Sequence, residues 1–288
     1  MKKIAITTAL LLSYPLLFAQ DTTSVEGIGS SPELGKAADA PSDKAQVDSR
    51  YQEVIDAFSN LPEETRVEFL KKRNEASVLF QNKRIFEALE ASRELIEIFP
   101  DDPQTINLRG ACYVELRDFG KATEQFELSK AITGPSFNVM FNIAEVAFVA
   151  EKWKESLQGF KDTLELAPEN ATQMRRLVEF KIMLCEIALG KDSSLSEEER
   201  KQHTATAKEM SQRYDYTDDS PYYYYANAAI NYAEDNDTEG LNWLNKGRRV
   251  YSANAQQLAS WEDTMTEYGY IKSYYGNDKA HKEDELSE

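Results

Sequence analysis

The chain has 288 residues, of which 50 are acidic and 33 are Lys or Arg, so its formal net charge at pH 7 is −17. A chain this acidic repels nucleic acid and anionic membrane surfaces, so we expect neither as a partner. Its acidic residues are dispersed and none follows the spacing of a calcium-binding loop. We therefore interpret the charge as favouring solubility and expect no metal site.

The N-terminus has the layout of a secretory signal peptide. Lys2 and Lys3 precede a largely apolar run from Ile4 to Phe18, and the small residue Ala19 closes it. This pattern predicts cleavage after residues 1–19. An uncleaved anchor is the alternative, but the run is shorter than the roughly 20 residues of a comfortable membrane span. We expect an exported protein, periplasmic or secreted, with no membrane insertion after cleavage and a net charge of −19, from 31 basic and 50 acidic side chains.

Composition changes once more before the main domain. Residues 20–46 are rich in Ser, Gly, Pro, Ala and Asp and almost lack large apolar side chains. Such a segment cannot bury enough apolar surface to offset its ordering entropy, so we expect a disordered leader. From residue 47 onward apolar residues recur at helical spacing and no useful length alternates with period two. We expect an all-α domain over residues 47–275 and a charged, flexible tail over residues 276–288.

Three consecutive segments, residues 69–100, 103–135 and 137–168, share one pattern with a period of 34 residues. Each has a small residue in a first helix, a second small residue in the next helix and a Pro at the end. These residues are Ala76, Ala88 and Pro100, then Gly110, Ala122 and Pro135, then Ala144, Ser156 and Pro168. Amphipathic helix pairs of this kind bury their faces by stacking, and about three are needed for a stable core.

The pattern resembles the tetratricopeptide repeat (TPR). The resemblance implies an all-α fold, a right-handed helical-hairpin solenoid of about five TPR-like repeats with a C-terminal capping helix. Beyond Pro168 the pattern loosens, and we expect helices over 174–189, 196–214, 222–232 and 241–251. Gly190 is expected to end the first of these, and a last helix over 253–275 to cap the stack.

The sequence contains few features that indicate an enzyme. Its only histidines are His203 and His281, and neither accompanies a recognisable nucleophile, phosphate-binding or metal-binding motif. We expect no catalytic residue and no cofactor. Cys112 and Cys185 fall in first helices two repeats apart, farther than the roughly 7 Å between Cα atoms that a disulfide allows, so we expect two buried free thiols.

In TPR proteins the first helix of each repeat, helix A, lines a concave groove that binds a partner. The resemblance implies that the groove of this chain is lined by Asn107, Val114, Glu115, Asn138, Phe141, Glu145, Phe148, Tyr222, Tyr225 and Tyr232. These residues make an aromatic, amide-bearing and mildly acidic surface, which suits an extended or helical peptide with apolar anchors and some positive charge. Phe141 is expected to face the groove, so that its truncation costs little stability.

We therefore expect a non-catalytic protein–protein interaction module, a scaffold or adaptor in the bacterial cell envelope. An alternative rests on the tyrosines, because 12 of the 15 lie between Tyr214 and Tyr275 and Tyr suits interfaces. In that alternative the chain is a self-assembling structural component, and its Tyr-rich C-terminal repeats form a homo-oligomer contact. The sequence does not indicate which protein is the partner.

Overall fold

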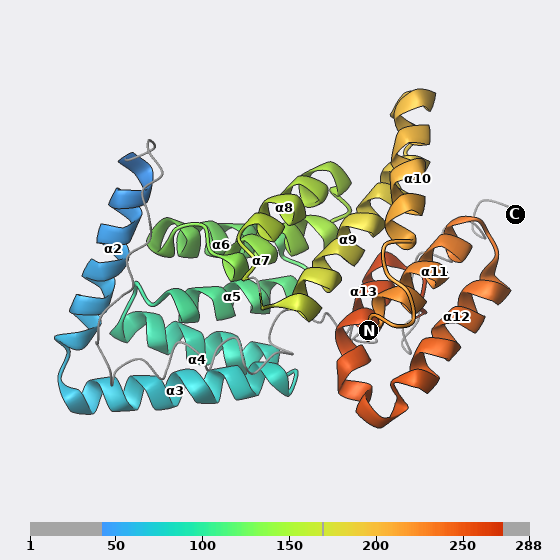
Figure 1. Ribbon diagram of the computed structural model, residues 1–288. Helices are drawn as coiled ribbons and strands as arrows, with labels where there is room; N and C mark the ends of the chain where they lie inside the picture. Colours follow the sequence, from blue (N-terminus) through green and yellow to red (C-terminus); the bar gives the residue numbers. More distant parts are fainter. Residues whose placement is uncertain (1–41, 169, 273–288) are drawn as a thin grey trace, which may run out of the picture. The chain divides into compact units, whose positions relative to one another are not determined.

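The computed structural model describes residues 42–168 and 170–272 of the chain (Figure 1). These residues are helical with short connections, and none of them forms a strand. They divide into two compact units, residues 42–142 and residues 143–272, called here the N-terminal unit and the C-terminal unit. The expected signal peptide, the leader as far as residue 41 and the tail over 276–288 lie outside the described residues.

The N-terminal unit holds five helices and the first part of a sixth. They are α2 (Ser42–Ser59), α3 (Glu63–Gln81), α4 (Ile85–Ile98), α5 (Pro103–Glu115), α6 (Phe119–Thr133) and α7 (Phe137–Val149), which crosses the boundary between the units. Helices α3 and α4 pack as one hairpin, and α5 and α6 pack as the next.

The C-terminal unit contains the rest of α7 and the later helices. These are α8 (Trp153–Glu165), α9 (Thr172–Lys191), α10 (Glu197–Ser211), α11 (Tyr222–Ala233), α12 (Asp237–Val250), the 3-10 helix η2 (Ser252–Leu258) and α13 (Ala259–Tyr268). Helices α9 and α10 form a hairpin, as do α11 and α12, and α8 packs against α9. The expected all-α architecture of consecutive helix hairpins is thus confirmed.

Four hairpins turn through one residue in the left-handed backbone region. Such a conformation is unfavourable for residues other than Gly, so the hydrogen bonds of the turn must hold it. In the first of them the Lys83 N–H donates to the Phe80 carbonyl at 2.8 Å, and the Arg84 N–H donates to the Leu79 carbonyl at 2.9 Å. The left-handed residues are Lys83 (φ 58°), Arg117 (φ 58°), Glu151 (φ 60°) and Asp235 (φ 59°).

These turns give the register of the repeats independently of side-chain identity. Lys83, Arg117 and Glu151 follow one another at intervals of 34 residues. Asp235 follows Ala228 by the same seven residues that separate Lys83 from Ala76, so α11 and α12 form a regular hairpin. The α9–α10 hairpin has no left-handed residue in its turn, and α10 begins instead with a capping box of Ser196 and Glu199.

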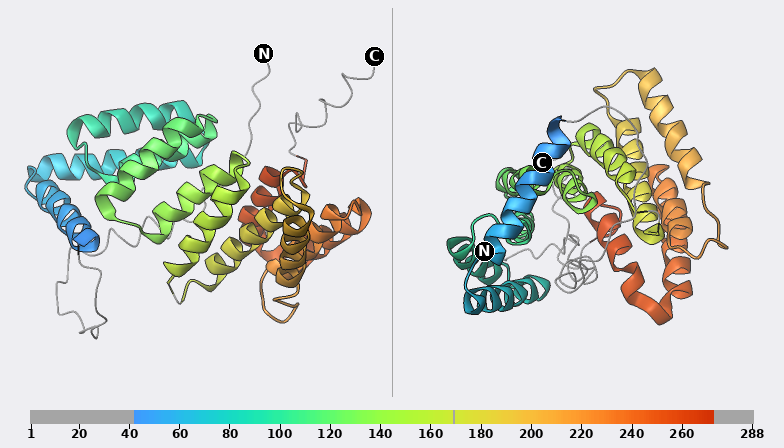
Figure 2. Two further views of the ribbon diagram at one scale, coloured as in Figure 1. Left: turned by 90° about the horizontal axis from the view of Figure 1, so that it is seen from above. Right: turned by 60° about the vertical axis from the view of Figure 1, so that its left-hand side comes forward.

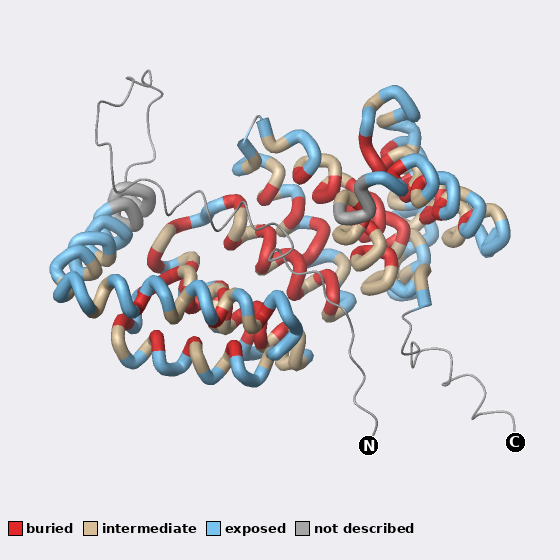
Figure 3. The backbone as a smooth tube through the Cα atoms, turned by 90° about the horizontal axis from the view of Figure 1, so that it is seen from below, coloured by how far each residue is buried: buried red, intermediate tan, exposed pale blue. Residues whose placement is uncertain are grey.

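The small residues of the pattern lie where helices cross closely. A Cβ atom on Gly110 would lie 2.5 Å from the ring of Phe126 on the paired helix, so no larger residue fits without a shift. In the next hairpin the Ser156 hydroxyl donates to the Ala144 carbonyl at 3.1 Å. Buried residues accordingly recur along the inner faces of the helices (Figure 3). The 34-residue pattern therefore marks helix–helix contacts, as the sequence predicts.

The first described helix begins earlier than expected. α2 starts at Ser42, whereas the domain was expected to start at residue 47. Phe58 near its end packs against Phe69 and Phe99, with ring centroids 5.4 and 5.3 Å apart, and α2 also contacts α6. The segment before residue 47 thus extends a helix whose C-terminal end is fixed by aromatic packing.

Two expectations about helix ends are wrong. Gly190 does not end α9, which continues to Lys191. A Cβ atom on Gly190 would lie 2.5 Å from the Thr204 hydroxyl of α10, so this Gly permits a close helix crossing. The last helix does not begin at Ala253 but follows a 3-10 turn, and α13 ends at Tyr268, where Gly269, with a φ of 99°, forms the left-handed C-terminal cap that Gly favours.

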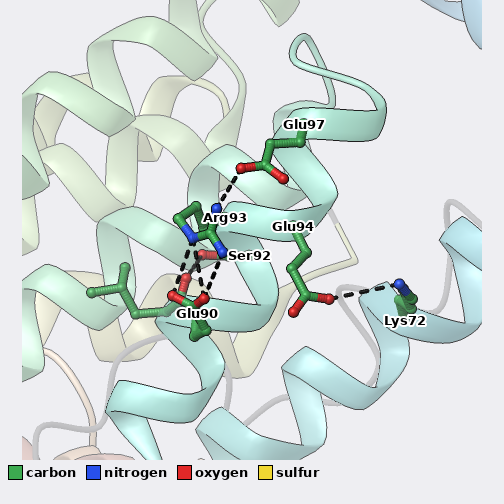
Figure 4. Close-up of polar contacts among 7 residues, drawn as sticks. Lys72, Glu90, Ser92, Arg93, Glu94 and Glu97 are labelled. Carbon is green, nitrogen blue, oxygen red and sulfur yellow. Dashed lines mark hydrogen bonds and ion pairs between the residues drawn. The ribbon is translucent and has the colours of Figure 1, made fainter.

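Charged side chains form ion pairs along α4 and between α4 and α3 (Figure 4). Arg93 bonds to Glu90 and Glu97 within α4, and the Lys72 Nζ of α3 lies 3.6 Å from a Glu94 carboxylate oxygen. Exposed pairs of this kind each contribute well under about 1 kcal/mol. Their main consequence is that this part of the hairpin surface stays solvated.

Candidate functional site: the helix-A faces

In the N-terminal unit the five expected groove residues differ in accessibility. Val114 is 1% exposed and Phe141 is 2% exposed, so both are core side chains. Asn107 and Asn138 are half-buried, and neither Oδ1 atom has a hydrogen-bond partner among the described residues. The burial of Phe141 contradicts the expectation that its truncation would cost little stability. Whether a partner contacts any of the five residues stays a prediction.

Glu115 is the only acidic member of this set. Its side chain is 5% exposed, and its carboxylate accepts a hydrogen bond of 2.9 Å from the Lys83 Nζ. Burial raises the pKa of Glu115, and the charge of Lys83 opposes that change without cancelling it. The acidity expected of this face is thus largely neutralised within the N-terminal unit itself.

In the C-terminal unit the expected groove residues lie under another helix of the same chain. Glu145, Phe148, Tyr222 and Tyr225 are at most 1% exposed, and Tyr232 is half-buried. Helix α13 packs beside α9 (Figure 2). Its side chains contact side chains of α7, α8, α11 and α12.

An aromatic cluster holds the N-terminal part of α13. The indole of Trp261 lies 5.2 Å from the ring of Phe180, 5.8 Å from Tyr225 and 6.2 Å from Tyr222, measured between centroids. Trp261 is 3% exposed. Aromatic contacts of this geometry each contribute about 0.5–1.5 kcal/mol beyond the area that they bury. Two of the expected groove tyrosines therefore do bind a side chain, but it belongs to their own chain.

A cation clamps the carboxylate next to this Trp. The Arg248 Nε and Nη2 atoms donate to the two oxygens of Glu262 at 2.9 and 2.6 Å, and the Tyr225 hydroxyl donates to the same carboxylate. A bidentate pair of this kind fixes orientation as well as adding energy. Burial, and then the charge of Glu262, raise the pKa of Tyr225, so its hydroxyl stays protonated and able to donate.

A buried lysine meets two carboxyl groups farther along α13. The Lys181 Nζ lies 2.8 Å from Glu145 Oε1 and 3.5 Å from Glu267 Oε2, and all three side chains are at most 3% exposed. The same ammonium lies 4.7 Å from the ring centroid of Phe148. Burial alone would lower the pKa of Lys181, but the two carboxylates outweigh it and raise that pKa, so Lys181 is a cation.

The carboxyl group of Glu267 lies close to that of Glu145, and their charges repel each other. Burial and the nearby Glu145 raise the pKa of Glu267 well above its ordinary value, although Lys181 acts in the opposite direction. Neither Glu267 oxygen makes a hydrogen bond with the described residues. One lysine therefore serves two buried acids, and protonation of Glu267 favours the docked position of α13.

Tyrosines complete the contact at the end of α13. Tyr268 lies 6.2 Å from Phe148 and 5.4 Å from Trp153, and Tyr270 stacks on Tyr232 at 5.2 Å. We call the residues that contact α13 and the Tyr270 that follows it the α13 cradle; they are Glu145, Phe148, Trp153, Phe180, Lys181, Tyr222, Tyr225, Tyr232 and Arg248. The expected groove residues of the C-terminal unit are all in it. The Tyr-rich run is largely used in packing within this unit, and the oligomer alternative stays untested.

Sequence reasoning missed the two cations of the cradle and the helix that it binds. Lys181 stands within an otherwise mostly apolar run of α9, and a charge at such a place indicates a buried ion pair, which was the available signal. Arg248 had no signal of its own, because α12 carries Arg249 and Lys246 beside it at exposed positions. Trp261 and Glu262 lay in a helix that was expected only to cap the stack.

The other reactive side chains of the described residues include two thiols and His203. The two thiols are free and buried, as expected, and burial raises the pKa of Cys112 and of Cys185 to about 12, which disfavours the reactive thiolate. The ring of His203 pairs with the carboxylate of Glu186. Within residues 42–168 and 170–272 no cluster of three His, Cys, Asp or Glu side chains is arranged to hold a metal ion. No helix there is both long and apolar enough to cross a bilayer.

Comparisons with known proteins give only distant likenesses. No protein-family model matches the chain. No curated protein sequence matches it either. One similar solved structure is that of YrrB, described as a TPR protein with an unusual peptide-binding site. It has 18% identity and a TM-score of 0.41, and the match covers 71% of this chain and 97% of that one.

The crystal structure of MamA protein is similar at 11% identity and a TM-score of 0.42, covering 68% of this chain and 96% of that one. These values are too low to transfer a binding property. The 34-residue period, the recurrent left-handed turn and the small residues at helix crossings are observations on this chain itself. On those observations the described residues have the fold of stacked TPR-like helix hairpins.

Proposed function

We propose that the protein is a non-catalytic interaction module, an adaptor or scaffold of the bacterial cell envelope, that binds a segment of a partner protein along its helix-A faces. The observation that carries the proposal is the α13 cradle, where helix-A side chains, together with Arg248 of α12, already hold a helix by aromatic and charged contacts. A surface that binds a helix of its own chain has the chemistry to bind one from another protein.

The N-terminal unit supports the same proposal with different chemistry. Asn107 and Asn138 lie at helix-A positions, and their side-chain oxygens have no hydrogen-bond partner among the described residues. Shielded amide oxygens without partners cost free energy, which a ligand N–H group can restore. An extended peptide, whose backbone presents N–H groups regularly, is the ligand that this face favours.

Site-specific photocrosslinking in the cell envelope of the source organism tests the proposal. A photoreactive amino acid replaces Asn107 on helix α5, and in a matched chain it replaces Leu128, which is 41% exposed on the paired helix α6. The proposal predicts one or a few defined protein adducts from residue 107 and none of the same adducts from residue 128. Identical adducts from both residues, or none from residue 107 in a folded chain, would reject it.

A further inference from the structure

The contacts of α13 define a recognition pattern on one short helix. Trp261, Thr264, Met265 and Tyr268 lie at helical spacing and form its inner stripe, of which the first three are buried. Glu262 and Glu267 flank this stripe on opposite sides, and each meets a cation of the cradle, Arg248 or Lys181. The cradle thus selects for aromatic residues on one face of a helix and for an acid beside them at the position of Glu262, because Lys181 is already shared with Glu145.

The cradle has the opposite charge preference from the one that the sequence indicated. Its cations come from two helices, α9 and α12, and the helix that they receive carries three acidic residues, Glu262, Asp263 and Glu267. An occupant of this surface is therefore acidic and aromatic, whereas a basic segment would leave Arg248 and Lys181 facing like charges.

Several features make α13 an exchangeable occupant. It has only 10 residues, and a helix of that length is marginal by itself, so its order depends on docking. It follows a 3-10 segment, Ser252–Leu258, that joins it to α12. Its docking also forces Glu267 beside Glu145, with a single lysine for both. A competing helix with an uncharged side chain in place of Glu267 avoids that repulsion.

We propose that the α13 cradle is a binding site for an acidic, aromatic amphipathic helix of another protein, and that α13 is a built-in competitor which this helix displaces. The partner helix carries a Trp, a carboxylate directly after it and a second aromatic residue seven positions beyond the Trp. This inference rests on the proposed function and specifies the partner chemistry. A short linker gives α13 an effective concentration on the order of millimolar, so the partner must bind the free cradle more tightly than α13 does.

The test uses the full chain and a labelled synthetic peptide of residues 258–271, which reproduces α13. Binding is measured by fluorescence anisotropy on the wild-type chain and on Trp261→Ala, which weakens the built-in competitor and leaves the cradle side chains in place. We expect the variant to bind the peptide at least tenfold more tightly than the wild type. Glu267→Lys places a second cation beside Lys181, so it should also undock α13 and free the cradle for the peptide. Circular dichroism confirms that each chain is folded.

Matched changes in the cradle and in the peptide sharpen the result. In the Trp261→Ala chain, a further Arg248→Gln substitution should weaken peptide binding about tenfold, whereas Arg249→Gln, on the exposed side of α12, should leave it unchanged. A peptide with Glu267→Gln should bind more tightly than the parent peptide. A peptide with Trp261→Ala should not bind measurably at the same concentrations.

Three outcomes overturn the inference. Folded Trp261→Ala and Glu267→Lys chains that both fail to bind the peptide would show that the cradle accepts α13 only as part of its own fold. Equal binding by the Arg248→Gln and Arg249→Gln chains would show that the peptide lies elsewhere. Sedimentation that finds the wild-type chain as a dimer, dissociated by the peptide, would assign the cradle to a second copy of this chain. Defined adducts at residue 107 alongside any of these results would leave the proposed function standing.

Discussion

The two units share one repeat pattern, but they differ in the side chains at the helix-A positions and in whether another helix covers them. In the N-terminal unit the helix-A positions hold Asn107 and Asn138, whose amide oxygens have no partner among the described residues, and a glutamate that Lys83 neutralises. In the C-terminal unit the same positions hold Phe148, Tyr222 and Tyr225, and a helix of the chain covers them. The period of the repeats thus determines where a binding face lies, whereas the side chains on that face determine what it binds.

Removal of the buried lysine should produce the largest difference between the units. Lys181→Met leaves Glu145 and Glu267 buried without their cation, and we expect it to lower the free energy of unfolding by about 3–5 kcal/mol. Lys83→Met is the counterpart in the N-terminal unit. Because Lys83 is 45% exposed and solvent screens its pair with Glu115, we expect a loss of only about 1 kcal/mol. Urea denaturation of both variants measures this, and equal losses would contradict the buried triad.

Phe141 tests whether the helix-A face of the N-terminal unit is core or groove. Its side chain is 2% exposed, so Phe141→Ala should lower the free energy of unfolding by about 3–5 kcal/mol, as for other buried Phe residues. Phe86→Ala, at a residue 69% exposed on α4, is the matched control and should cost little. A melting temperature that is nearly unchanged by Phe141→Ala would restore the groove position that the sequence alone indicated.

The small crossing residues should show a somewhat smaller effect. Gly110→Ala places a methyl group 2.5 Å from the Phe126 ring, and we expect a loss of about 1–3 kcal/mol from overpacking. Gly120→Ala is the control in the same hairpin, since only the Asp118 carboxylate lies near, at 3.9 Å. There the better helix propensity of Ala should leave stability equal or raise it by up to about 1 kcal/mol. Thermal unfolding compares the two, and the reverse order would invalidate the hairpin register.

The smallest expected effect is a pH dependence of α13 docking in the C-terminal unit. Docking of α13 raises the pKa of Glu267 above its ordinary value, so the contribution of this proton is fully present below that ordinary value. It is lost as the pH rises through the raised pKa. The groups that face Glu267 are Lys181 on α9, Glu145 on α7 and Asp263 on its own helix.

The α13 peptide should therefore bind the Trp261→Ala chain several-fold more weakly at pH 8 than at pH 5.5, in anisotropy titrations at constant ionic strength. The Glu267→Gln peptide is the control, because it has no proton to lose at this position, and its affinity should change much less. A parent peptide that binds more tightly as the pH rises would mean that the sign of the coupling is wrong.

The repeat period could be predicted from the sequence because small residues are obligatory wherever helices cross. Gly110 falls at such a crossing, where a Cβ atom would lie 2.5 Å from the Phe126 ring, and Ser156 falls at another, where its hydroxyl bonds to the Ala144 carbonyl. The end of α9 was wrongly predicted at Gly190, because a Gly residue can either end a helix or permit a close helix crossing. The contact with Thr204 shows that Gly190 permits a crossing. The left-handed conformations in the turns could not be predicted from the sequence, because the residues that adopt them are Lys, Arg, Glu and Asp rather than Gly.

The sequence predicted where the candidate site lies, but not that its side chains are covered by α13. Tyr222 and Tyr225 lie on the helix-A face that the register indicated, yet their exposure depends on where α13 packs. That packing joins Trp261 and Glu267 to residues between 36 positions (Tyr225) and 122 positions (Glu145) earlier in the chain, and no local period encodes such a contact. A long-range pairing of this kind appears in a single sequence only as an unexplained buried charge, which here was Lys181.

Hydrogen exchange on the wild-type chain tests the displacement of α13 most directly. The chain is exposed to a saturating amount of the Glu267→Gln peptide, labelled uniformly with heavy isotopes so that the masses of peptide and chain separate. If α13 is an exchangeable occupant, exchange over residues 259–268 of the chain accelerates at least tenfold while α9 and α11 stay protected. Unchanged protection of residues 259–268 under saturating peptide, with the chain folded, would contradict the account.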